Sequence, residues 1–202
     1  MKLLVDTDAF CKLGVAQLLD DALASFNVRP TDCGRLPALP YMLQRGSLPR
    51  RFGAEACSAL IPVAESMTVP QEASTRWLDA LAAASNVDPG EAQLLAAAAD
   101  SNIPMLSGDK RALRAVKEVA GLPAALHGRI ICLEAALLAL GDRLGWDVLR
   151  QRVTPLSQVD TTIGICFSAG NADPRSALYS YFRSLASEVD PLALWAPPER
   201  TE

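Results

Sequence analysis

Three acidic residues stand where the chain could bring carboxylates together. Asp6 directly follows a short apolar run at residues 3–5, and Asp109 follows a second such run that ends at Leu106. Glu91 opens a segment rich in alanine and leucine. Ligands of parallel α/β sheets collect outside the carboxyl ends of the strands. We therefore expect the three side chains to converge on one cavity.

Clustered carboxylates favour metal chemistry. Several such groups cannot stay ionised side by side without a counter-charge. A hard divalent cation such as Mg²⁺ or Mn²⁺ supplies that charge, because carboxylate oxygens suit these ions. The pattern therefore predicts metal-assisted phosphodiester chemistry.

Glu91 and Asp109 also have a simpler structural interpretation. The sequence Asp88-Pro89-Gly90-Glu91 is typical of a helix start in which Asp88 and Glu91 form a capping box. Asp109 can cap the helix that follows it. Asp6 is harder to explain in this way, because an acid beside a buried strand is costly without a partner. Thr7 or Asp8 can cap the helix after the first strand.

The elements that would position these acids alternate along the chain. Apolar runs predict strands at residues 3–5, 103–106 and 128–133, a weak strand at 36–39, and one more at 159–167. Periodic segments predict helices at 52–67, 74–84, from 88 to about 100, at 110–119, from 134 onward and at 174–189.

This order predicts an α/β protein, a three-layer α/β/α fold with a short central parallel sheet. A largely helical C-terminal extension follows. The domain carrying the acids would span residues 1–135, and residues 136–202 would pack on the same core.

Bulk composition is that of one globular unit. The chain has 202 residues, of which 50% are hydrophobic and 21% charged, enough for one buried core. The net charge of −4 argues against a dedicated high-affinity nucleic-acid binder but does not exclude a nuclease. The five cysteines include no C-x-x-C pair, which makes a disulfide framework or a zinc site a poor interpretation.

The apolar runs are too short to span a bilayer, which needs about 20 residues. Asp6 interrupts the N-terminus before a signal-peptide core could form. A cytoplasmic protein without membrane association is the expectation.

Three motifs together resemble the PIN domain family. They are Leu-Val-Asp-Thr-Asp at residues 4–8, Asp-Pro-Gly-Glu-Ala-Gln at 88–93 and Ser-Gly-Asp-Lys-Arg-Ala-Leu at 107–113. They look most like the branch with Gly-Glu-Ala-Glu and Asp-Lys-Arg motifs, related to the VapC-type toxin ribonucleases. The resemblance covers roughly residues 1–135.

The resemblance implies an Mg²⁺- or Mn²⁺-dependent ribonuclease acting on single-stranded RNA. Asp6, Glu91 and Asp109 would be its catalytic, metal-binding carboxylates, with Asp8 as a further carboxylate of the metal site. A protein antitoxin or regulator, and a homodimer, are partners known in the family.

One departure from the family pattern concerns a helical glutamate between the first and third motifs. Near its expected place this chain has Gln44. Glu55 or Glu65 could substitute from a shifted helix, and the sequence does not choose between them.

Basic residues could hold the RNA backbone without reading its sequence. The candidates follow Asp109 and are Lys110, Arg111, Arg114 and Lys117. Lys110, Arg114 and Lys117 have the spacing of one helix face. Arg45, Arg50 and Arg51 form a second small cluster.

Two other functions stay open. A degenerate PIN-like module that binds a protein or RNA partner without cutting would account for Gln44 and the acidic charge. A haloacid-dehalogenase-type phosphatase is suggested by Asp6-Thr7-Asp8, although Phe10, Ala112 and Leu113 depart from that pattern. The single histidine, His127, lies outside all three motifs, which gives a Ser-His-Asp triad little support.

Overall fold

A short parallel sheet organises the fold in this computed structural model. The structure describes residues 1–197, and residues 198–202, at the end of the C-terminal extension, lie outside the described part. Within residues 1–197 the sheet has four strands, in the order β2-β1-β3-β4. The strands are β1 (Leu3–Val5), β2 (Cys33–Gly34), β3 (Met105–Ser107) and β4 (Ile130–Cys132). The strands predicted at 3–5, 103–106 and 128–133 are thus confirmed as β1, β3 and β4.

All strand pairs are parallel, so their carboxyl ends meet at one edge of the sheet. In the register, Leu4 lies opposite Met105, and Leu106 lies opposite Ile131. The residues of all four strands are buried. This explains why the strands are continuous apolar runs without polar alternation.

Helices cover both faces of the sheet, which confirms the predicted α/β/α arrangement. The helices up to β3 are α1 (Thr7–Val15), α2 (Leu19–Ser25), α3 (Leu39–Gln44), α4 (Ser47–Phe52), α5 (Ala54–Ser66), α6 (Thr75–Ala82) and α7 (Pro89–Ser101). Those after β3 are α8 (Lys110–Val116), α9 (Leu122–Ala125), α10 (Leu133–Leu144), α11 (Trp146–Val153), α12 (Thr161–Cys166) and α13 (Pro174–Glu188). Two 3₁₀ turns, Pro30–Asp32 and Thr154–Leu156, complete the elements of residues 1–197.

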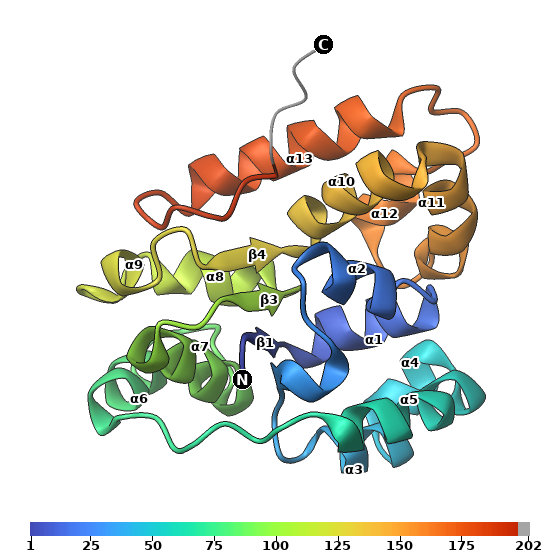
Figure 1. Ribbon diagram of the computed structural model, residues 1–202. Coiled ribbons are helices and arrows are strands. Elements are labelled where there is room, and N and C mark those ends of the chain that lie inside the picture. The colour runs from blue at the N-terminus through green and yellow to red at the C-terminus, as the bar shows by residue number, and fades with distance from the viewer. Residues whose placement is uncertain (198–202) are drawn as a thin grey trace.

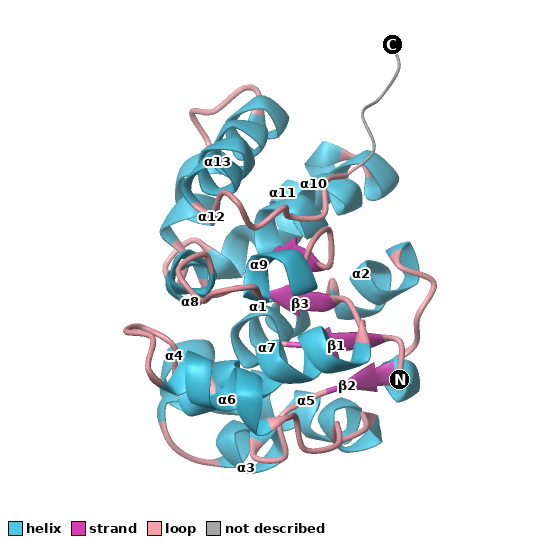
Figure 2. Ribbon diagram, turned by 90° about the vertical axis from the view of Figure 1, so that its left-hand side faces the viewer, coloured by secondary structure: helices cyan, strands magenta, loops and turns pink. Residues whose placement is uncertain are grey.

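The two faces of the sheet are covered by different helices. In Figure 1 the strands lie between α7 and α9 on one side and α1, α2 and α10 on the other, and Figure 2 shows α7 in front of the strands.

The C-terminal extension is helical and contacts the first half of the chain. Helix α10 packs on α2 and α13. Beyond α13, the backbone N–H of Trp195 donates to the carbonyl of Ile130 at 2.8 Å. The indole of Trp195 meets the ring of Phe26 edge-on, with centroids 5.2 Å apart. The apolar residues of both halves belong to one buried cluster.

The strand predicted at residues 36–39 is wrong. Strand β2 lies earlier, at Cys33–Gly34, and residues 36–38 turn into α3. The guanidinium of Arg35 donates to the carbonyls of Leu36 and Pro37, at 2.8 and 3.0 Å. These bonds hold the segment in a turn, and Pro37 could not have donated to a strand ladder.

The strand predicted at residues 159–167 is also wrong, because this segment forms α12. Asp160 caps the helix by accepting a hydrogen bond from the backbone N–H of Ile163 at 3.0 Å. The buried residues Thr162, Ile163 and Cys166 lie on one helical face, while Ile165 is half exposed. The β-branched residues of this segment favour a strand, but the N-cap hydrogen bond and the buried helical face stabilise a helix.

No helix within residues 1–197 is long and apolar enough to cross a membrane. The five cysteines are buried free thiols.

Candidate functional site

A cavity of about 970 Å³ lies at the edge of the sheet where the strands end. Asp6, Asp8, Glu91 and Asp109 all line it. Asp6 follows β1, Asp109 follows β3, and Glu91 stands in the first turn of α7. The structure therefore brings the four sequence-predicted acids together.

Asp6 is a buried carboxyl group held by backbone amides. The chain places it directly after β1, where it is 4% exposed. Its Oδ2 accepts a hydrogen bond from the N–H of Gly108 at 3.0 Å. Burial, together with the charges of Asp8 and Asp109, raises the pKa of Asp6 to about 6, although hydrogen bonds from the Gly108 and Asp8 amides oppose the shift.

Gly108 is needed for this close approach. A Cβ atom at position 108 would collide with Oδ2 of Asp8. A larger residue would have to displace the Asp8 carboxylate and crowd the backbone nitrogen of Ala9 at the start of α1. The Ser-Gly-Asp motif therefore sets the geometry of the site as well as supplying Asp109.

Glu91 and Asp109 both have the structural roles that the sequence suggested, and they also contact each other. Glu91 forms the predicted capping box with Asp88, with bonds of 2.8 and 3.0 Å. Asp109 caps α8 by accepting from the N–H groups of Arg111 and Ala112. Capping thus does not exclude a place at the cavity.

The carboxyl groups of Glu91 and Asp109 interact, and their pKa values shift in opposite directions. Burial, and then the negative charge of Asp109, raises the pKa of Glu91. Burial opposes ionisation of Asp109 too, but hydrogen bonds from the Arg111 guanidinium, Glu91 and two amides lower its pKa. The two neighbouring acids therefore differ in electrostatic environment, with ionisation disfavoured at Glu91 and favoured at Asp109.

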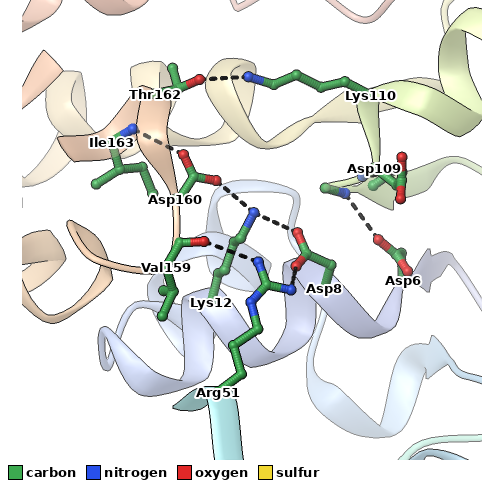
Figure 3. Close-up of polar contacts among 12 residues, drawn as sticks. Asp6, Asp8, Lys12, Arg51, Asp109, Lys110, Val159, Asp160, Thr162 and Ile163 are labelled. Atoms are coloured by element: carbon green, nitrogen blue, oxygen red, sulfur yellow. Dashed lines mark hydrogen bonds and ion pairs between the residues drawn. The ribbon is translucent and has the colours of Figure 1, made fainter. Parts of the chain in front are cut away.

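Asp8 lies in a different environment, surrounded by cations. Lys12 Nζ is 2.6 Å from its Oδ2, and Arg51 Nη1 donates to its Oδ1 at 3.0 Å. Lys12 Nζ also contacts Asp160 Oδ2 at 2.6 Å, as Figure 3 shows. The prediction that Thr7 or Asp8 caps α1 is wrong, because Asp6 is the N-cap residue, without a side-chain cap bond.

The four predicted RNA-backbone residues all have partners within the fold. Lys110 Nζ is 2.5 Å from Glu134 Oε1 and 2.7 Å from the hydroxyl of Thr162. Arg111 pairs with Asp109 at 2.9 Å. The remaining two contact α13: Arg114 pairs with Glu188, and Lys117 donates to the Glu188 carbonyl. Lys110, Arg111 and Arg114 also line the cavity.

The glutamate expected between the first and third motifs has no counterpart among the described lining residues. Gln44, Glu55 and Glu65 are exposed and lie outside the lining. Helices α3 and α4 contribute Met42, Leu48 and Arg51 instead. This wall of the cavity is apolar and cationic.

Sequence reasoning missed Lys12, Asp160 and Thr162 as site residues. Lys12 carried a usable signal, since Asp8 and Lys12 have the i, i+4 spacing of a helical ion pair. Asp160 and Thr162 lie in the segment predicted as a strand. That prediction missed the N-cap at Asp160 and the start of α12, which lines the cavity.

No protein-family model, curated protein or solved structure shows significant similarity to the chain. The resemblance to the PIN domain family therefore stays a prediction from three motifs. The acids that line the cavity therefore carry the functional conclusion.

Proposed function

We propose that the chain is a metal-dependent ribonuclease that hydrolyses phosphodiester bonds of single-stranded RNA, with Mg²⁺ or Mn²⁺ bound at Asp6, Glu91 and Asp109. One observation carries the proposal: carboxyl groups that follow two neighbouring strands and open a third element line the same cavity. A parallel sheet collects ligands at this edge.

The chemistry of the donors fits a hard cation. The three side chains offer only oxygen atoms, and the raised pKa values of Asp6 and Glu91 reflect the cost of leaving these carboxylates buried and near other negative charges. Within residues 1–197, no group of three or more His, Cys, Asp or Glu side chains is placed closely enough to hold an ion. Binding of an ion would therefore need Asp6, Glu91 and Asp109 to move closer together, and the ion would compete for Asp109 with Arg111, whose side chain is 76% exposed.

A bound divalent ion lowers the pKa of a coordinated water and stabilises negative charge on the phosphate. The chain's own groups would position the reactants. The Gly108 amide fixes the Asp6 carboxylate, and the capping box fixes Glu91. Arg111 and Arg114, both at the cavity, would hold phosphate oxygens.

One observation favours a second function, a non-cutting module that binds an RNA or protein partner. Cations already contact the carboxylates of Asp8 and Asp109, through Lys12, Arg51 and Arg111. A site neutralised in this way could bind without catalysis. Such a partner could be of the antitoxin or regulator kind that the family resemblance implies.

Cleavage of an end-labelled single-stranded RNA distinguishes the two functions. Wild type would be assayed with Mn²⁺, Mg²⁺ or EDTA beside the double variant Asp6→Asn, Asp109→Asn. Asp20→Asn is the matched control, because Asp20 is an exposed acid outside the cavity. We expect metal-dependent cleavage by wild type and the control, and none by the double variant. Folded wild type that does not cut with either metal would rule out the nuclease.

A further inference from the structure

Lys12 is a buried cation built into the cavity wall. Its side chain is 6% exposed, and its Nζ lies 2.6 Å from a carboxylate oxygen of both Asp8 and Asp160. Asp8 is one helical turn earlier in α1, whereas Asp160 is 148 residues away and caps α12. Two distant parts of the chain therefore hold one ammonium group, as Figure 3 shows.

Arg51 completes the neutralisation of Asp8 from a third element. Its Nη1 donates to Asp8 Oδ1 and its Nη2 to the Val159 carbonyl, both at 3.0 Å. The two oxygens of Asp160 are also engaged, Oδ1 by the Ile163 amide and Oδ2 by Lys12. Each carboxylate oxygen on this side thus has a nitrogen donor.

The charge of Lys12 persists despite its burial. Burial disfavours the ammonium form, but contacts with two carboxylate oxygens at 2.6 Å offset this cost. A lysine is a compact point charge with three donors, which suits it to bridge two carboxylates. Lys12 therefore does on this side what a metal ion would otherwise do.

In a two-metal nuclease the ions sit about 3.5–4 Å apart and bracket the phosphate. We propose that Lys12, held between Asp8 and Asp160, takes the place of a second ion, so that the chain binds a single divalent cation at Asp6, Glu91 and Asp109. This inference rests on the proposed nuclease. It assigns Asp8 and Asp160 to positioning Lys12 rather than to metal binding.

Counting bound Mn²⁺ tests the inference directly. Titration followed by electron paramagnetic resonance measures free Mn²⁺, and two adjacent ions also give an exchange-coupled spectrum. We expect one Mn²⁺ per wild-type chain without coupling, and a second, coupled ion in Lys12→Met, which frees the Oδ2 atoms of Asp8 and Asp160. The matched control Lys2→Met removes an exposed lysine, 3.8 Å from Asp32, and should keep a count of one.

Two coupled ions in wild type, or one ion in folded Lys12→Met, would overturn the inference. Should Lys12→Met not fold, the wild-type count and spectrum decide alone. RNA cleavage measured on the same samples separates the two proposals. Two ions with metal-dependent cleavage would contradict only the role of Lys12, whereas no bound Mn²⁺ and no cleavage would contradict the nuclease as well.

Discussion

The two sides of the cavity contain the same kind of residue in opposite electrostatic conditions. On one side, Asp6 and Glu91 are buried carboxyl groups whose pKa values are raised. On the other, Lys12 lies between Asp8 and Asp160, and the pKa of Asp160 is lowered because Lys12 and the Ile163 amide outweigh the effect of burial.

The difference shows that the neighbouring groups of an acid at the carboxyl edge of the sheet, rather than its residue type, determine its pKa and its capacity to bind a metal ion. Carboxylates held by a buried ammonium group, as Asp8 and Asp160 are by Lys12, gain little from a metal ion. Carboxyl groups whose pKa values are raised by burial and mutual repulsion gain more, because an ion supplies the counter-charge that they lack. Asp6 and Glu91 would take a cation from solution, whereas Asp8 and Asp160 already share the ammonium group of Lys12.

The largest effect should follow from removing the built-in cation. Lys12→Met leaves Asp8 and Asp160 without their shared partner, and breaking a buried ion pair in this way costs about 3–5 kcal/mol. Urea unfolding would measure the free energy of unfolding, with the exposed-lysine variant Lys2→Met as control. Equal stability of the two variants would show that Lys12 does not hold its side of the cavity together.

Metal should stabilise the other side. At a free Mn²⁺ concentration about 100-fold above its dissociation constant, linkage adds about 2.7 kcal/mol to the free energy of unfolding. Thermal unfolding followed by circular dichroism should show a higher Tm for wild type and Asp20→Asn. Asp109→Asn should lose this increase, and retention of the full increase would exclude Asp109 as a ligand.

Without metal, the stability of the chain should fall as pH rises. The pKa of Asp6 is about 6 in the folded chain against 3.8 for the unfolded group, so the folded state keeps a proton that the unfolded state has lost between these values. This contribution is fully present below the unfolded pKa and lost as pH rises through the folded one. We expect Asp6 to contribute about 1–1.5 kcal/mol less at about pH 7.5 than at about pH 5.

Urea unfolding at the two pH values, in EDTA, measures this slope. Glu91 should add to it, because its pKa is raised as well. The lowered pKa values of Asp109 and Asp160 act in the opposite direction, but at lower pH. Asp6→Asn should therefore reduce the slope, and an unchanged slope would mean that Asp6 is not the group responsible.

The smallest effect belongs to an exposed ion pair of the same chemical kind. Arg114 and Glu188 are 2.6 Å apart, and their side chains are 45% and 42% exposed. A double-mutant cycle with Arg114→Ala and Glu188→Ala should give a coupling energy of about 0.2–1 kcal/mol. A coupling as large as the Lys12→Met effect would show that burial does not explain the strength of the Lys12 contacts.

Local patterns in the sequence predicted the sheet edge and the acids on it. The runs that became β1, β3 and β4 are apolar on both faces, and each acid follows or opens an element with a clear boundary. The capping box of α7 was visible as Asp88-Pro89-Gly90-Glu91. These features depend on residues close together in the chain, and a single sequence reveals them.

The pairing of Lys12 with Asp160 and of Arg51 with Asp8 could not be predicted in the same way. Asp160 lies 148 residues from Lys12, and nothing local marks the two as partners. The β-branched residues that follow Asp160 favour a strand, but the N-cap at Asp160 and the buried helical face of this segment stabilise α12. Arg51 reaches Asp8 only because α4 packs against α1. Long-range pairing, rather than composition, determined this half of the cavity.

The most direct test of the account is anomalous diffraction from crystals of the wild-type chain soaked with Mn²⁺. The account predicts one anomalous peak, bounded by the carboxylates of Asp6, Glu91 and Asp109, with Lys12 still between Asp8 and Asp160. A peak between Asp8 and Asp160, or no peak in the cavity at saturating Mn²⁺, would contradict it.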